Sequence, residues 1–157
     1  MPQNNEPITL EFDEFPPSLN SGEGFIRNNR WALSNSRDLW VLKIKTAFFG
    51  EPPRETIDSC VIFYTLFKVR LSDPDNLQAS FKFIGDALVR SEIIKNDSQD
   101  VIHVLHTTQQ RVAHFREQKC RVEIYPVPKL PGSQLQTEME QWLRQRVSAI
   151  TVVTDTP

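Results

Sequence analysis

The chain has 157 residues and a net charge of −2, from 18 basic and 20 acidic residues. This length favours one domain with at most a short appendage, and a hydrophobic content of 39% excludes wholesale disorder. The charge balance excludes a protein that is basic over its whole surface, as many nucleic-acid-binding proteins are, but it leaves room for a local basic groove.

The first part of the chain predicts a strand, a loop and a helix. Apolar and polar residues alternate between positions 8 and 12, which predicts a half-buried strand over about 7–13. A pair of prolines ends this strand because proline has no backbone N–H to donate. A helix is expected to begin near Ser34 or Ser36, either of which can cap it. Its predicted apolar face consists of Leu39, Leu42, Thr46 and Phe49.

The middle of the chain predicts a buried strand, a second helix and two further strands. The β-branched and aromatic run at 60–67 is typical of a central strand that is buried on both faces. A helix is expected over 75–90, and two strands over 101–111 and 120–127 that form a hairpin. The order is β, α, β, α, β, β, which indicates an α+β fold with a mixed sheet. The stripe expected to bury the second helix consists of Leu77, Phe81, Ile84 and Leu88.

The last part of the chain reads as an appendage. Residues 1–127 form the expected domain, and 128–157 contain a Pro-rich linker followed by an amphipathic helix over about 137–150.

Cys60 and Cys120 lie in apolar runs without metal-ligand spacing, so we expect both to be reduced core residues. No apolar run reaches the ~18 residues of a membrane span, and the first residues lack a signal-peptide pattern, so we expect a cytoplasmic protein.

Acidic residues gather where the predicted central strand gives way to the second helix. Asp73 and Asp75 are placed to hold a hard cation such as Mg²⁺, which prefers oxygen ligands. Capping and turn formation at the start of the helix are the alternative explanation. On a helix, Asp75, Lys82 and Asp86 share the face opposite the core stripe. Asp97 is a candidate third carboxylate if the chain folds back toward the sheet.

Three segments, read together, resemble the RusA family of Holliday junction resolvases. They are PPSLN at 16–20, DPDNLQASFKFIGDAL at 73–88 and NDSQDV at 96–101. The resemblance extends from about Ile8 to Tyr125 and implies a RusA-like α+β fold. It also implies a homodimeric endodeoxyribonuclease of DNA recombination and repair that cuts branched DNA, the four-way Holliday junction, with Mg²⁺ or alternatively Mn²⁺.

The resemblance also implies roles for particular residues. The metal ligands would be Asp73, Asp75 and Asp97, and the family's helical lysine would be Lys82, although shorter family members carry it one turn earlier. Asn96 stands where the family has the first aspartate of a pair. Candidates for contacts with the DNA backbone, for which ordinary solvated charge is the alternative, are Asn20, Arg27, Arg30, Arg37, Lys43, Lys68 and Arg70.

A second function stays open from the sequence. The acidic balance, Asn96 and the added tail also suit a weakly active or inactive module of the same fold that binds DNA junctions, or a partner through the helix at 137–150. His103 and His106 would point to opposite faces of a strand, which disfavours a shared metal ion.

Overall fold

A computed structural model describes residues 7–18, 30–48, 53, 55–129, 137 and 139–145 of the chain. The chain divides into two compact units, Met1–Val127 and Pro128–Pro157. The second unit has helical residues at 139–145. None of the helices in the described ranges is both long enough and apolar enough to span a membrane.

The first unit contains the elements of an α+β domain. The prediction of a β, α, β, α, β, β order is confirmed, with one short 3₁₀ turn, η2, added before the last strand. In chain order the elements are β1 (Ile8–Phe12), α1 (Arg30–Ala47), β2 (Cys60–Lys68), α2 (Pro74–Arg90), β3 (Ile102–Arg111), η2 (Phe115–Glu117) and β4 (Lys119–Pro126).

The four strands form one mixed sheet in the order β1-β4-β2-β3. β2 is parallel to β3 and antiparallel to β4, and β4 is antiparallel to β1. The predicted hairpin between β3 and β4 is therefore wrong, because the two strands lie on opposite sides of β2. β2 is buried along most of its length, and a neighbour on each side satisfies its backbone groups better than an edge position would. Its predicted central position is confirmed.

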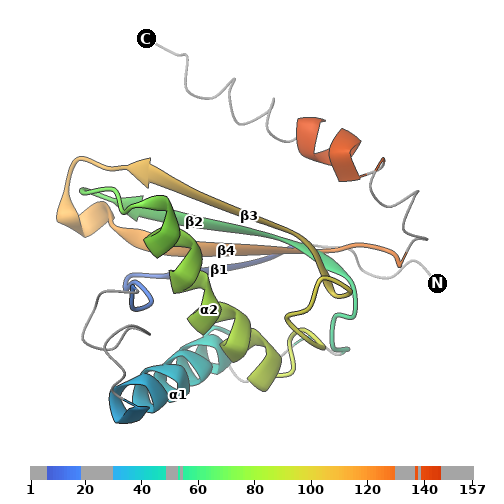
Figure 1. Cartoon of the computed structure of the whole chain (residues 1–157), viewed down its shortest axis with the longest axis horizontal. Coiled ribbons are helices and arrows are strands. Elements are labelled where there is room, and N and C mark those ends of the chain that lie inside the picture. The colour runs from blue at the N-terminus through green and yellow to red at the C-terminus, as the bar shows by residue number, and fades with distance from the viewer. Residues whose placement is uncertain are drawn as a thin grey trace. The chain divides into compact units, whose positions relative to one another are not determined.

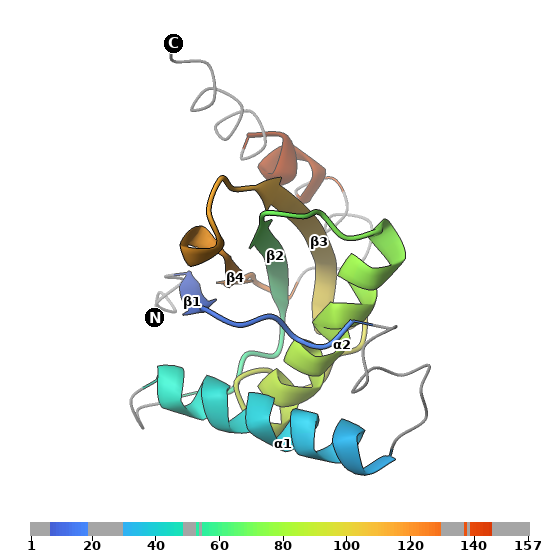
Figure 2. The ribbon, with the colours of Figure 1, turned by 90° about the vertical axis from the view of Figure 1, so that its left-hand side faces the viewer.

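Both helices lie on the same side of the sheet (Figures 1 and 2). Alternate residues of β2, such as Ile62 and Tyr64, belong to the core beneath them. The predicted apolar stripe of α2 is confirmed, since all four of its members are buried. Tyr64 places its hydroxyl 2.8 Å from the Ser80 hydroxyl of α2, which satisfies two polar groups inside this core.

The buried face of α1 differs from the predicted one. Leu39 and Leu42 are 47% and 61% exposed, whereas Trp40 and Ile44 are buried. Phe49 lies outside the described residues, and the helix begins at Arg30, earlier than either serine cap. The Trp40 ring meets Phe12 of β1 edge-on with centroids 5.2 Å apart, so the contact of Trp40 with β1 turns the helix face that carries the leucines away from the core.

Both cysteines lie in the core of the sheet. Cys60 and Cys120 are free and fully buried, as predicted, and burial raises the pKa of each thiol to about 12.

An ion cluster on the surface of the sheet joins β1 to β4. Partial burial acts to raise the pKa of Glu11 on β1, but hydrogen bonds from Arg121 and Lys119 on β4 outweigh it. The pKa of Glu11 is therefore below its ordinary value of 4.5.

Candidate metal and nucleic-acid site

Two of the three candidate metal-binding carboxylates lie at the start of α2. Asp73 is the N-cap residue and Asp75 lies in the first turn, with Pro74 between them at a position where its missing N–H costs nothing. The backbone carbonyl of Asp73 accepts the Leu77 N–H at 3.0 Å, but its side chain makes no capping hydrogen bond. Capping therefore does not use the Asp73 carboxylate, and both carboxylates are solvent-exposed next to the positive end of the helix dipole.

The turn that presents these carboxylates is fastened to the sheet. The Gln109 side chain of β3 accepts the Ser72 N–H at 2.8 Å and donates to the Ser72 carbonyl at 2.6 Å. The Gln118 side chain accepts the Val69 N–H at 3.0 Å. At the end of β2, Lys68 donates to the Ser72 hydroxyl. The segment between β2 and α2 is thus hydrogen-bonded to side chains from β2, from β3 and from the residue before β4, and these bonds fix where α2 begins.

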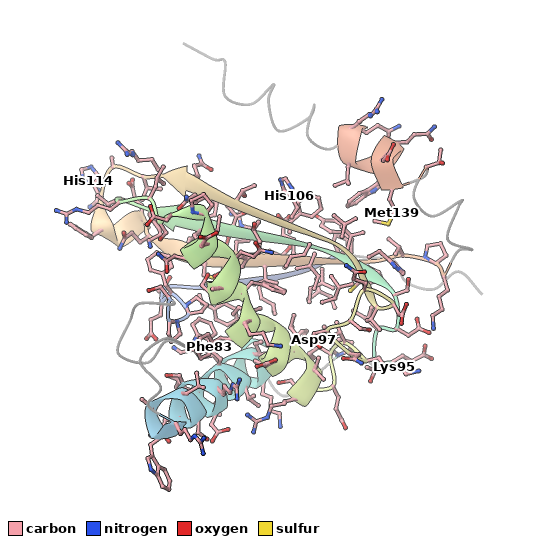
Figure 3. The ribbon with its side chains drawn as sticks, in the orientation of Figure 1. Phe83, Lys95, Asp97, His106, His114 and Met139 are labelled. Carbon is pink, nitrogen blue, oxygen red and sulfur yellow. The ribbon has the colours of Figure 1, made fainter. Side chains whose placement is uncertain are left out.

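Lys82 joins α2 to the loop before β3. Its ammonium lies 2.9 Å from Asp97 and 3.0 Å from Asp86, one turn further along the helix. Figure 3 shows Asp97 beside α2. The hydrogen bond to Asp97, followed by that to Asp86, raises the pKa of Lys82, and the hydrogen bond from Lys82 lowers the pKa of Asp97. Asn96 accepts the Asp97 N–H at 2.7 Å, so it shapes the loop that presents the carboxylate.

The structure places Asp97 some way along α2 from the first two aspartates. Lys82 follows Asp75 by seven residues, which corresponds to about 10 Å of helix at ~1.5 Å per residue. In the ranges that the structure describes, no three His, Cys, Asp or Glu side chains converge as a metal-binding group. Asp75, Lys82 and Asp86 do share one helix face, as the sequence predicts, since Lys82 pairs with Asp86 across one turn.

The side chains present fit a magnesium ion in their chemistry. Mg²⁺ takes one or two carboxylates, keeps several waters and leaves room for a phosphate oxygen. Asp73 and Asp75 supply two such oxygen ligands, and neither carboxylate is engaged by the hydrogen bonds and ion pairs described above. Asp97 lies beside Lys82, so it would have to move toward the start of α2 to share one ion with Asp73 and Asp75.

The basic candidates differ in their surroundings. Arg37 of α1 lies 3.5 Å from Asp86, next to the Lys82 cluster, whereas Lys43 pairs with Glu14 at 2.7 Å. Arg30 and Arg70 are exposed, and burial lowers the pKa of Lys68. Asn20 and Arg27 lie outside the described residues.

Some residues of the site were missed in the sequence analysis. Asp86 was placed on the right face but given no role, although its spacing of four from Lys82 signals an ion pair. Gln109 had no sequence signal, because its partner is a backbone 37 residues away. His103 accepts or donates a hydrogen bond of 2.7 Å with Ser59, and His106 packs edge-on against Phe63. Figure 3 shows His106 and His114 well away from Asp97.

A comparison of the chain with protein-family models finds no match, and neither does a comparison with curated proteins.

Proposed function

We propose that this chain is a RusA-like, Mg²⁺-dependent endodeoxyribonuclease that cuts branched DNA of the Holliday-junction type. The single observation that carries the proposal is the 2.9 Å contact between Lys82 and Asp97. It brings the third acidic segment of the motif set onto the helix that begins with the first two carboxylates. The Asp73 side chain at the helix start, which makes no capping hydrogen bond, supports the same reading.

Each residue has a task in this proposal. Asp73 and Asp75, with Asp97 when it is released, would hold the ion, with Mn²⁺ as an alternative to Mg²⁺. When bound there, such an ion would supply a water of lowered pKa and positive charge for the phosphodiester. Lys82 would contribute a point cation to the same phosphate. A homodimer would set two such sites against opposed strands of one junction.

The test is a nicking assay on a labelled four-way junction, with a linear duplex of the same sequence as the comparison. We expect cutting of the junction in Mg²⁺ and none in EDTA. Asp73→Asn and Asp75→Asn should each lower the rate at least ~100-fold, the equivalent of about 2.7 kcal/mol of transition-state stabilisation, while junction binding persists. Asp100→Asn, an exposed carboxylate three residues from Asp97, is the matched control and should cut normally. Full activity of both Asp73→Asn and Asp75→Asn would refute the proposal.

The same ion pair also favours a second candidate, a module that binds junctions without cutting them. While Lys82 neutralises Asp97, the cluster offers DNA a hydrogen-bonded surface rather than a third metal ligand. The two candidates differ in one result. Junction binding that is equal in Mg²⁺ and EDTA, without nicks in either, selects the binding module.

A further inference from the structure

A cavity of about 410 Å³ lies between α2 and the first half of β3, and the Lys82–Asp97 pair forms part of its wall. Its size is within the range of about 300–1,000 Å³ that small-molecule sites occupy. Phe81, Ile102 and Leu105 give it apolar surface. This combination of a charged rim and an apolar interior is unlike a simple gap in the core.

We propose that this cavity receives an unpaired nucleobase of the DNA substrate. The inference rests on the proposed function and deepens it, since it names what the site binds beside the scissile strand. Enzymes that take a base out of a duplex pack it against aromatic and apolar side chains and read its edge by hydrogen bonds. The Phe81 ring and Leu105 offer the first kind of contact, and polar side chains at the rim offer the second.

The polar groups of the rim suit the edge of a base. Gln78 on α2 and Gln99 in the loop before β3 both line the cavity and are exposed. Each amide carries two donors and an acceptor, and every base edge presents a mixture of the two. Within the described residues, neither amide side chain has a hydrogen-bond partner to give up.

A second hollow, of about 310 Å³, is also lined by this ion pair. It shares Lys82 and Asp97 with the first and adds Arg37 and Arg90. All three cations are paired with carboxylates: Arg37 and Lys82 with Asp86, Lys82 also with Asp97, and Arg90 with Asp38 at 2.9 Å. A DNA phosphate would therefore bind in this hollow by replacing one of these carboxylates, while the planar, largely apolar base enters the first cavity.

Gly85 is the independent observation that supports an open cavity. It lies in the interior of α2, where glycine is a weaker helix former than alanine, and it lines the cavity. A Cβ added there would come 3.4 Å from the Phe81 ring, an ordinary contact, so the fold does not require glycine at this point. A larger side chain at 85 would instead occupy the space next to that ring.

The experiment places the fluorescent base 2-aminopurine at the branch point of a four-way junction and, separately, within a paired arm. Binding is followed in EDTA, so that the readout does not depend on cutting. The wild-type chain should raise the branch-point fluorescence several-fold by unstacking the base and leave the arm signal unchanged. Gly85→Leu and Leu105→Trp fill the cavity from opposite walls, and each should lower the rise at least fivefold while junction binding by anisotropy persists.

Two further variants keep the test interpretable. Gln110→Trp adds the same bulk to an exposed position of β3 outside the cavity and should behave as wild type. Gly85→Ala should melt about 2 to 4 °C higher, which shows that position 85 accepts a side chain. The fluorescence result is taken from the cavity-filling variant, Gly85→Leu or Leu105→Trp, that unfolds in a single cooperative transition.

Failure of the inference and failure of the proposed function look different. Full branch-point fluorescence in a folded cavity-filling variant overturns the inference, even if the wild-type chain cuts junctions in Mg²⁺. A wild-type chain that raises the fluorescence in EDTA but never cuts overturns the proposed nuclease and upholds the base-binding cavity. Equal signals from the branch point and the arm also overturn the inference.

Discussion

Replacing Lys82 with methionine tests the ion pair on which the proposed site depends. The Lys82 ammonium lies about 3 Å from both Asp86 and Asp97, so these two carboxylates are at most about 6 Å apart. The side chain of Lys82 is 50% exposed, so each pair is worth only ~0.2–1 kcal/mol. Once the ammonium is removed, the two negative charges repel by about 0.7 kcal/mol at the dielectric constant of water. Together these effects lower the free energy of unfolding by about 1–3 kcal/mol.

The assay is urea unfolding, followed by tryptophan fluorescence, in a double-mutant cycle of Lys82→Met with Asp97→Asn. We expect a coupling free energy of about 0.5–1 kcal/mol that shrinks in 1 M NaCl, because salt screens exposed charges. Lys95→Met removes another exposed lysine from the loop that carries Asp97 and should change stability by less than ~0.5 kcal/mol. A coupling below ~0.2 kcal/mol at low salt would refute the reasoning, since it falls under the weakest exposed pairs measured.

Three further predictions concern other parts of the domain. Gln109→Leu removes both hydrogen bonds to Ser72 and should lower the free energy of unfolding by about 1–2 kcal/mol, with a parallel loss of junction cutting as the turn before α2 loosens. Because the pKa of Glu11 is lowered in the folded state, its contribution is complete above pH 4.5 and disappears as the pH falls through the folded-state value. The stability difference between wild type and Glu11→Gln, ~0.5 kcal/mol at pH 7, should therefore vanish in acid, as pH-dependent urea titrations will show. Cys60 and Cys120 should resist a thiol reagent in the native state at pH 8 and both react in guanidinium, since burial keeps them protonated; rapid native labelling of either would contradict their placement.

The sequence was sufficient for elements whose burial has one clear pattern. The bounds of α2, Pro74–Arg90, agree with the predicted 75–90 to within one residue, because its apolar stripe, Pro74 and the preceding turn all point to the same answer. The central strand was found for a similar reason, since a long β-branched and aromatic run fits only a strand with neighbours on both sides. Periodicity misjudged α1 because apolar residues occur around most of that helix, and the contact between Trp40 and Phe12 decides which face is buried.

Properties that depend on distant partners were beyond the sequence. The sequence spacing of β3 and β4 does not show that β2 lies between them. Strand pairing depends on which strand edges still have unpaired backbone N–H and C=O groups. At the candidate site, the sequence predicted that Asp97 returns toward the sheet, whereas its ion pair with Lys82 of α2 depends on the path of the loop between α2 and β3. The hold of Gln109 on the turn before α2 is of the same kind.

The position of β4 has a consequence for the order of assembly at the ribosome. Residues Ile8 and Ile124 are register partners, so β1 has no partner strand until nearly the whole first unit has been synthesised. At about 5–20 residues per second, that wait lasts roughly 6 to 23 seconds. During it, β2, α2 and β3 can already form a parallel unit, and the final strand must then enter between two segments made long before it. A nascent chain released before β4 is made would expose one edge of β2, and an exposed strand edge can pair with another chain and aggregate.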